Sequence, residues 1–351
     1  MSRPIFDRKN ILITGGAGFI GSHLCDELVK EHKVICLDNF LTGQEENINH
    51  LLQNPNFEFI KHDFTEPIDF ENELGLKPFQ VEFQGIQEIY HLASPASPKD
   101  YLDMPIETLM SNARATLHSL ELAKKYQARL VFTSSATIYG SPLEKTPYPE
   151  NYWGYVDPIG PHSALSEGKR FAESLMFHYR KKHKINAKIA RIFKVYGPRL
   201  RINDGRMIPE MIIKALNNEQ ITVYGETDET ISACYVSDIV EGLIRLMKSN
   251  ELGPINLGTS EERPLKEMAE IIKKLSNSNS KIKLVSGEKG DFINHGTPNI
   301  RLAKEHLGWF PVVSLEDGLS RTIDYFKGVK NITIKHFESS INQTEKSHER
   351  K

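Results

Sequence analysis

The chain has 351 residues, of which 39% are hydrophobic and 26% charged, and its formal net charge is −2. This composition is ordinary for a globular protein with a core of sufficient size, and the charge balance does not indicate binding to nucleic acid or to an anionic membrane. No apolar run approaches the roughly 20 residues that span a bilayer. Three isolated cysteines predict neither a disulfide framework nor a metal site, and the N-terminus has no apolar core of a signal peptide, so we expect a cytoplasmic protein without metal.

The first elements in the chain predict a dinucleotide site. An apolar run at 11–13 breaks into a turn with glycines at 15, 16, 18 and 21, and a helical pattern begins near Phe19. The order of strand, glycine turn and helix lets the backbone approach a pyrophosphate at a helix N-terminus. Gly15 makes the tight turn, Gly18 leaves room for phosphates, and Gly21 lets the helix pack closely on the strand. The alternative is a glycine-rich turn that serves only packing.

A second apolar strand, at 34–37, ends in Asp38, which lies 17 residues beyond Gly21. A carboxylate there accepts hydrogen bonds from both ribose hydroxyls of an adenosine and repels a 2′-phosphate. The sequence therefore favours NAD over NADP.

Later elements predict an α/β fold of the Rossmann type, a doubly wound parallel sheet with a smaller C-terminal lobe for substrate. Further strand patterns lie at 57–60, 88–92, 129–132 and 187–192, separated by helical patterns at 105–126 and 163–182. Helices of this length imply right-handed crossovers between parallel strands. Beyond about Gly197 we expect shorter elements, at 207–216, 221–224, 265–275, 282–285 and 315–326. The predicted division is a mainly NAD-binding domain over 1–196, a mainly substrate-binding lobe over 197–330, and a polar tail over 331–351.

Ten segments between about residue 10 and residue 325 form a specific set: ILITGGAGFIGSHL, LDNFLTG, HLASPASPKDY, NYWGYVDPIGP, SEGKRFAE, ARIFKVYGPRL, NDGR, ITVYG, YVSDIVEGL and INLG. The set resembles the extended short-chain dehydrogenase/reductase family, the NAD-dependent epimerase/dehydratase enzymes that modify nucleotide sugars. Within that family it most closely resembles the UDP-glucuronate decarboxylases. The resemblance implies NAD in the first lobe and a UDP-sugar between the lobes. The segment at 69–84 is an insert relative to the family.

The resemblance and the glycine motif together assign the site residues. Asp63 would contact the adenine amino group, and Lys169 would hold the nicotinamide ribose. The cofactor set is Gly15, Gly18, Phe19, Ile20, Gly21, Asp38, Asn39, Phe40, Thr42, Gly43, Asp63, Phe64, Leu92, Ala93, Ser94 and Lys169. The UDP-sugar set is Ser94, Pro95, Tyr101, Lys194, Arg199, Arg206, Val223, Tyr224 and His295.

The chain departs from the family where the chemistry occurs. The usual base is a tyrosine four residues before the lysine, so that both face the nicotinamide, but here Leu165 precedes Lys169. Thr137 stands where decarboxylases carry a glutamate, and Ile231 stands where they carry an arginine. The loss of all three predicts that the protein does not decarboxylate UDP-glucuronate.

Other positions are candidates to replace the missing positive charge at the diphosphate and the missing acid/base group. Lys194 replaces the asparagine of the family motif and is predicted to lie beside the diphosphate, with His295 and Arg199 nearby; the alternative is a solvated strand-end lysine. The candidates for proton transfer to or from the sugar hydroxyl are Ser134, Ser135, Thr137 and His162, followed by Asp100, Tyr101 and Tyr155. His162 titrates in a suitable range, but a histidine just before a helix is also typical of a cap or a surface position.

Three functions remain open from the sequence. The first is an NAD-dependent oxidoreductase acting at C4 of a UDP-hexose, as in the Bacillus-type enzymes of pseudaminic acid synthesis that act on a 5,6-unsaturated UDP-N-acetylhexosamine and give a 4-keto-6-deoxy sugar. The second is a decarboxylase or epimerase with another base, and the third is an NAD-bound pseudoenzyme that senses a UDP-sugar. The resemblance also implies a homodimer through a four-helix bundle, with Leu117, Leu120, Phe171 and Leu175 on its face or packed on the sheet.

Overall fold

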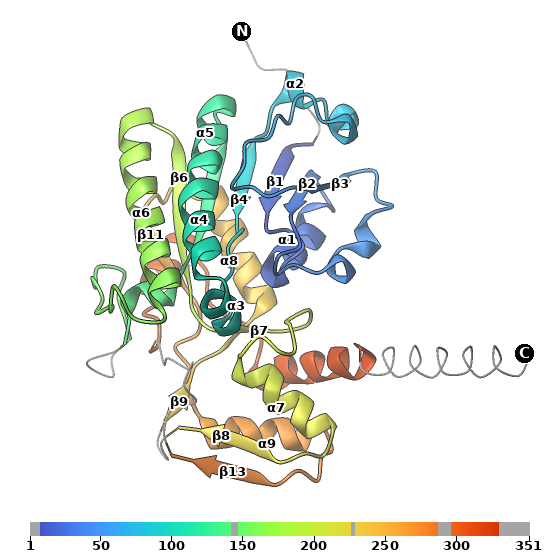
Figure 1. The fold of residues 1–351 in the computed structure, drawn as a ribbon, viewed down its shortest axis with the longest axis vertical. Coiled ribbons are helices and arrows are strands. Elements are labelled where there is room, and N and C mark those ends of the chain that lie inside the picture. The colour runs from blue at the N-terminus through green and yellow to red at the C-terminus, as the bar shows by residue number, and fades with distance from the viewer. Residues whose placement is uncertain (1–7, 142–146, 226–228, 287–295, 330–351) are drawn as a thin grey trace, which may run out of the picture.

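The structure is a computed structural model that describes residues 8–141, 147–225, 229–286 and 296–329. A seven-stranded sheet with helices on both faces forms the larger part, and a smaller lobe lies beyond one end of the strands (Figure 1). The sheet is made of β1 (Asn10–Thr14), β2 (Lys33–Asp38), β3 (Phe57–Lys61), β4 (Glu88–His91), β5 (Arg129–Ser135), β6 (Asn186–Ile192) and β11 (Pro254–Leu257).

The strand order is β11-β6-β5-β4-β1-β2-β3, and all the pairings are parallel. The chain starts in the middle at β1, moves outward through β2 and β3, and then crosses back to β4 on the other side of β1. Open sheets with this reversal form a crevice at the carboxyl ends of the two central strands. The predicted doubly wound Rossmann-type sheet is confirmed.

The two faces of the sheet bury alternate residues of each strand. Ile11 and Ile13 of β1 belong to the core cluster that contains α1 (Phe19–Leu28) and α8 (Val236–Lys248). Leu12 belongs to the opposite cluster. Because successive side chains of a strand point to opposite faces, an unbroken apolar run is what a strand covered on both sides requires.

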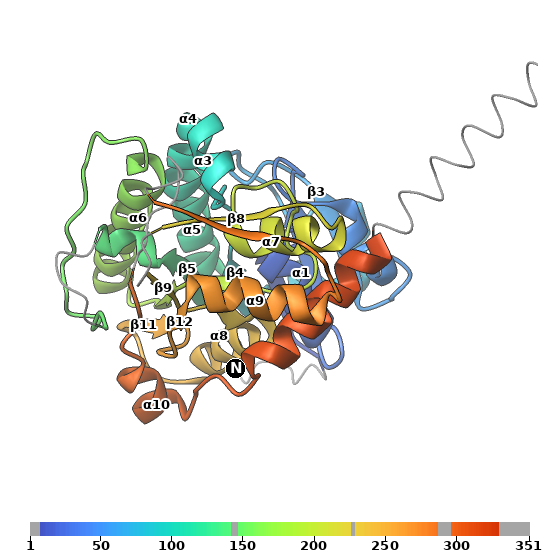
Figure 2. The same ribbon diagram turned by 90° about the horizontal axis from the view of Figure 1, so that it is seen from below.

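The opposite face is covered by α5 (Thr116–Tyr126) and α6 (Ser163–His183), and α4 (Pro105–Met110) packs against α6 (Figure 2). A π-helical turn at Ser111–Ala115 joins α4 to α5, so the predicted helical stretch at 105–126 is continuous. The shorter elements are η1 (Glu45–Asn47), η2 (Asn49–Leu51), α3 (Pro98–Asp103), η5 (Ala136–Tyr139), β7 (Val195–Tyr196), β9 (Thr230–Ile231), β10 (Cys234–Tyr235), β12 (Arg263–Pro264) and α10 (Arg301–Leu307).

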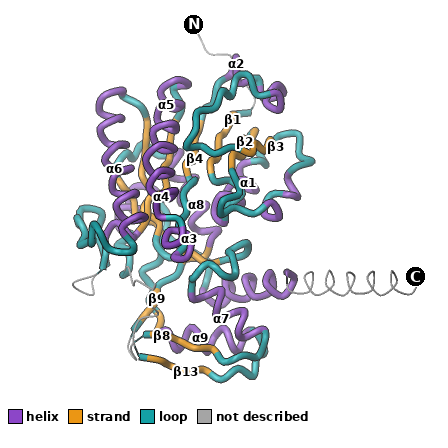
Figure 3. The backbone as a smooth tube through the Cα atoms, in the orientation of Figure 1, coloured by secondary structure: helices purple, strands orange, loops and turns teal. Residues whose placement is uncertain are grey.

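The smaller lobe holds α7 (Met207–Leu216), β8 (Ile221–Tyr224), α9 (Leu265–Leu275) and β13 (Ile282–Val285), with the predicted bounds (Figure 3). β8 pairs with β13 in parallel, and a further helix covers 315–329. Between these segments the chain returns to the larger part through α8 and β11. The division at residue 196 stays a prediction, since β11 completes the main sheet.

The inserted segment at 69–84 forms η3 (Leu74–Phe79) and α2 (Val81–Gln84) at the amino-terminal edge of the sheet. Asn10 at the start of β1 donates through Nδ2 to the carbonyl oxygens of Phe79, at 2.8 Å, and Gly85, at 2.9 Å. The buried apolar residues of the segment are Phe70, Leu76, Phe79 and Val81. The insert therefore closes the core at the edge that lies away from the carboxyl ends of the strands.

Two of the residues considered for a dimer face are exposed and one is not. Phe171 on α6 is 54% exposed and Leu117 on α5 is 39% exposed, whereas Leu120 is fully buried in the core. Leu120 thus packs under its own helix, and the homodimer stays a prediction. Within the described part of the chain, no helix is long and apolar enough to cross a membrane.

Candidate active site

A cavity of about 360 Å³ opens at the carboxyl ends of the strands, where the strand order reverses between β1 and β4. Its wall runs from the glycine turn after β1, past the ends of β2, β4 and β5, to Lys169 on α6 and the loop at 198–206. The volume suits a small-molecule ligand. Among the described residues, no group of three or more His, Cys, Asp or Glu side chains could hold a metal ion.

The glycine turn brings the backbone to the cavity surface. Gly15 has φ +72°, and a Cβ there would lie 2.8 Å from the backbone nitrogen of Ala93. A Cβ at Gly21 would lie 2.9 Å from Cα of Gly16 and would clash with the carbonyl oxygen of Gly15. Gly18 is the N-cap of α1. Only glycines allow this close crossing of turn, helix and strand, and the resulting cradle fits a pyrophosphate at the N-terminus of α1.

Asp38 ends β2 on the same wall and is 7% exposed. Its carboxylate accepts hydrogen bonds from the backbone nitrogens of Ala17, at 3.0 Å, and Phe40, at 2.9 Å. Burial raises the pKa of this carboxyl, and the backbone donors oppose that shift. The donors hold the carboxylate at the end of β2, the position at which an acidic residue contacts the adenosine ribose in Rossmann-type folds.

Of the predicted cofactor residues, two support the wall without lining it. Phe40 has φ +61° and stacks on Phe59 with ring centroids 4.9 Å apart, and a Cβ at Gly43 would lie 2.8 Å from Oδ1 of Asp38. The residues that line the cavity are Gly15, Gly18, Phe19, Ile20, Gly21, Asp38, Asn39, Thr42, Asp63, Phe64, Leu92, Ala93, Ser94 and Lys169.

Lys169 reaches the cavity from α6 and is 4% exposed. Its ammonium donates to the carbonyl oxygen of Thr133 at 2.9 Å and lies 4.7 Å from the ring centroid of Phe132. Burial lowers the pKa of Lys169 to about 7, against the opposing effect of the Glu173 carboxylate. Near pH 7, Lys169 therefore exists in both protonation states.

The three departures from the family pattern converge on this cavity. Leu165 lies one helical turn before Lys169, is 2% exposed and lines the wall. Thr137 in η5 and Ile231 in β9 line the same wall from two other segments. Oγ1 of Thr137 is buried and has no hydrogen-bond partner among the described residues. The cavity wall is thus apolar or neutral at the three positions where the sequence predicted a departure from the family pattern.

Ser134 and Ser135 end β5 and border the cavity, but both hydroxyls have partners within the protein. Oγ of Ser134 donates to Glu173 at 2.6 Å, and Oγ of Ser135 accepts from the backbone nitrogen of Thr137 at 3.2 Å. These contacts position the strand end, and a proton role for either serine stays a prediction.

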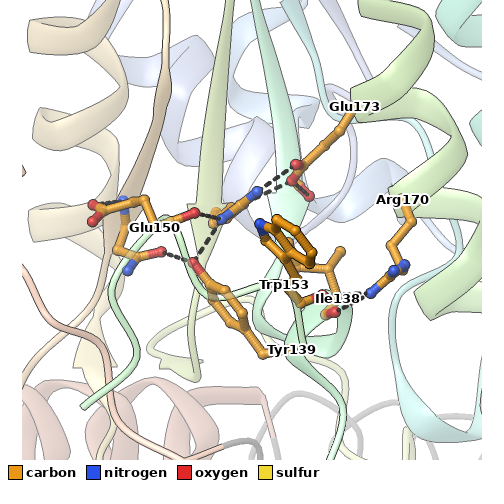
Figure 4. A network of polar contacts seen from close by, with 9 residues as sticks. Ile138, Tyr139, Glu150, Trp153, Arg170 and Glu173 are labelled. Carbon is orange, nitrogen blue, oxygen red and sulfur yellow. Dashed lines mark hydrogen bonds and ion pairs between the residues drawn. The ribbon is translucent and has the colours of Figure 1, made fainter. Parts of the chain in front are cut away.

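Glu173 belongs to a buried network that the sequence did not reveal (Figure 4). Its carboxylate pairs with Arg191 at 2.7 Å, and Arg191 donates to the Tyr139 hydroxyl at 2.8 Å and to the carbonyl oxygen of Glu150 at 2.7 Å. The only available signal was the spacing of four residues between Lys169 and Glu173, which puts both on one helix face. The network ties α6 to β6 behind the cavity.

Tyr101 and His162 form a contact that the sequence also did not reveal. Tyr101, on α3, is 4% exposed and lines the cavity, and its hydroxyl lies 3.0 Å from Nδ1 of His162. The two rings meet edge to face with centroids 5.7 Å apart. His162 is half-buried, precedes α6 and is not part of the cavity wall.

Each arginine that lines the described part of the cavity has a carboxylate partner. The pairs are Arg199 with Asp26 at 2.7 Å, Arg201 with Asp100 at 2.9 Å, and Arg206 with Asp204. Arg199 and Arg206 were predicted; Arg201 was missed, because nothing in the sequence relates it to Asp100.

The remaining predicted substrate residues divide into three groups. Ser94, Pro95 and Lys194 line the cavity, and burial lowers the pKa of Lys194 to about 8 while Glu229 and Glu262 oppose that shift. Val223 is fully buried in the core, and neither it nor Tyr224 lines the described wall. His295 lies outside the described residues.

Comparisons with known proteins agree with this geometry. Residues 11–258 match the "NAD dependent epimerase/dehydratase family". The chain is 46% identical over 322 residues to UDP-glucuronic acid decarboxylase 1 of Xenopus tropicalis, covering 92% of this chain and 73% of that protein.

Two solved structures share the fold. A UDP-glucose 4-epimerase of Thermotoga maritima with UDP-glucose has a TM-score of 0.79 at 26% identity, over 91% of this chain and 99% of that one. A UDP-glucuronic acid 4-epimerase of Bacillus cereus in complex with NAD has a TM-score of 0.75 at 27% identity, with the same coverage. NAD also fits the glycine cradle and Asp38 described above. The chain belongs to the NAD-dependent epimerase/dehydratase family and is an NAD-dependent enzyme of the extended short-chain dehydrogenase/reductase type.

Proposed function

We propose that this protein is an oxidoreductase that exchanges hydride between bound NAD and C4 of a UDP-linked hexose without the usual catalytic tyrosine. The main support for this proposal is the position of Leu165. It is buried on the cavity wall one turn before Lys169, where the resemblance places the base. Most of the residues predicted for NAD line the cavity, whereas Leu165 stands where the resemblance implies the tyrosine base.

Decarboxylation of a uronic acid is disfavoured by the same wall. Thr137 and Ile231 replace the glutamate and arginine that would handle a C6 carboxylate, and both line the cavity. High overall identity to decarboxylases reflects a shared fold and family, while the reaction depends on a few side chains. These features support a neutral sugar ring as substrate.

Lys194 and Arg206 support the UDP end of the proposed substrate. Both line the cavity, and a diphosphate needs local positive charge. Lys194 provides a point charge and Arg206 a planar donor group. Binding of UDP-glucose by a structural neighbour supports the same class of ligand here.

The missing tyrosine favours a substrate that loses its proton easily. Oxidation at C4 of a 5,6-unsaturated N-acetylhexosamine gives a conjugated ketone, so the hydroxyl proton is lost with less help from a base. We therefore propose a UDP-N-acetylhexosamine derivative as substrate. For the 5,6-unsaturated form, the hydride taken from C4 would return to C6 and a proton would add at C5, so that the product is a 4-keto-6-deoxy sugar of the pseudaminic acid type and the cofactor ends oxidised.

Mass spectrometry of UDP-sugars after incubation with the NAD-loaded protein tests this proposal. The panel holds UDP-glucuronate, UDP-N-acetylglucosamine and its 5,6-unsaturated derivative. We expect a 4-keto product from an amino sugar and no change in UDP-glucuronate. Release of carbon dioxide from UDP-glucuronate would contradict the argument from Leu165, Thr137 and Ile231. Tight binding without turnover of any sugar would contradict it in favour of a UDP-sugar sensor.

A further inference from the structure

The loss of the tyrosine at position 165 leaves the C4 hydroxyl without its usual proton acceptor. Tyr101 is the one tyrosine on the described cavity wall, and its hydroxyl is bonded to His162. His162, Leu165 and Lys169 follow one another at spacings of three and four residues, so they share one face at the start of α6. The pair thus lies within about one helical turn of the position that the base would occupy.

We propose that Tyr101 and His162 act together as the proton acceptor and donor for the C4 hydroxyl. This inference rests on the proposed function and deepens it. Tyr101 is the catalytic residue, because its ring lines the cavity, and His162 is the positioning and proton-accepting residue behind it.

The step balances without any further reactant. The C4 hydroxyl gives its proton to the phenolic oxygen of Tyr101, whose own proton moves to Nδ1 of His162. NAD, which the glycine turn and Asp38 would hold, would supply the hydride acceptor for the hydrogen on C4, so that the carbinol carbon is oxidised to a ketone. The half-buried imidazole, now charged, holds the proton for the reverse step or passes it to solvent.

Both partners are held in place by their own elements. α3 begins at the N-cap Ser97, whose hydroxyl accepts from the backbone nitrogen of Asp100 at 3.2 Å, and Arg201 pairs with Asp100 at 2.9 Å. The backbone carbonyl of His162 accepts from Oγ of Ser166 at 3.0 Å. α3 packs directly against α6. A proton relay requires such fixed geometry, since transfer depends on hydrogen-bond reach between donor and acceptor.

The test combines removal of the phenol with restoration of the family's base. In Tyr101→Phe we expect kcat to fall about 100-fold or more, the size of a general acid–base contribution. The kcat of His162→Asn should fall by a similar factor, because the asparagine amide can accept a hydrogen bond but cannot take up the proton. Calorimetric binding of UDP to the NAD-loaded variants should change less than about threefold, within the scatter of non-critical contacts. Tyr126→Phe, on the far end of α5, is the matched control.

The rescue variant separates a proton role from a structural one. The double variant with Leu165→Tyr and Tyr101→Phe should have a kcat at least about tenfold higher than Tyr101→Phe alone. The added tyrosine then lies one helical turn before Lys169, where the family carries its base. Imidazole ¹⁵N NMR of the NAD-loaded protein should show the His162 hydrogen bond in the native chain and its loss in Tyr101→Phe, without any turnover.

Several results would overturn the relay. One is a kcat of Tyr101→Phe close to that of the native chain; the oxidoreductase proposal would then stand and Lys169 would become the base. Others are an equal loss of UDP binding and kcat, or an absence of rescue by Leu165→Tyr. If the native chain turns over no UDP-sugar at all, the proposed function fails first and the relay with it.

Discussion

Replacing Lys169 by Met should stabilise the protein without cofactor, by an amount that depends on pH. Burial lowers the pKa of Lys169 from 10.5 to about 7. Since one pKa unit corresponds to about 1.4 kcal/mol, the buried charge costs about 5 kcal/mol when the lysine is protonated in both states. Below pH 7 that cost is fully present. Between pH 7 and 10.5 the unfolded chain binds more protons than the folded one, so the stability of the native chain rises with pH.

Methionine has no proton to exchange, so the advantage of Lys169→Met over the native chain should shrink as pH rises. From the two pKa values we expect it to fall by about 2 to 3 kcal/mol between pH 6 and pH 9. The hydrogen bond to the Thr133 carbonyl is also lost, but that contribution, about 1 kcal/mol, is nearly the same at both pH values. Urea unfolding of both proteins without NAD measures the difference. The exposed Lys182 on the same helix, changed to Met, is the control. Equal stability differences at both pH values would refute the argument that Lys169 is desolvated.

Three further changes test the two ends of the cavity. Gly21→Ala should destabilise the protein by about 1–3 kcal/mol and weaken NAD binding, because its Cβ meets the Gly15 turn; Gly253→Ala, with no atom within 4 Å, should stay within about 0.5 kcal/mol in thermal unfolding. Asp38→Asn should weaken NAD binding about tenfold and reduce the ratio of NAD to NADP affinity, both measured by fluorescence titration. An unchanged affinity ratio would show that Asp38 does not contact the ribose. Lys194→Met should weaken UDP binding by about tenfold at low salt and by less at high salt, since salt screens the attraction between the lysine and the diphosphate. A loss of affinity that calorimetry finds to be independent of salt would indicate that Lys194 has only a structural role.

The parts of the fold that the sequence predicted are those encoded by local patterns. The bounds of α7, β8, α9 and β13 follow directly from apolar spacing and Gly or Pro punctuation. The entry of β11 into the main sheet was not predicted, because it pairs with β6, which lies some sixty residues earlier in the chain. The π-helical turn between α4 and α5 has no sequence signature of its own.

The same distinction holds at the site. Most residues predicted for NAD were found to line one cavity because they lie within a few residues of a strand end, and the ends of parallel strands meet at one edge. Lys169, within α6, was assigned by the resemblance. The pairs formed by Tyr101 with His162 and by Arg201 with Asp100 join segments that lie 61 and 101 residues apart, respectively. Side-chain contacts at such separations arise only from the assembled fold. Val223 was placed on the substrate wall by resemblance, yet the alternation of β8 buries it in the core.

Hydride transfer without the tyrosine can be followed directly by the time-resolved absorbance of reduced nicotinamide in the NAD-loaded native protein after addition of a UDP-N-acetylhexosamine or its 5,6-unsaturated derivative. We predict that reduced cofactor forms even though Leu165 occupies the place of the base, and that it persists with the saturated amino sugar but is transient with the 5,6-unsaturated one, whose hydride returns to C6. UDP-glucuronate should leave the spectrum unchanged. A spectrum that stays constant with the amino sugars while UDP-glucuronate reduces the cofactor would contradict this prediction.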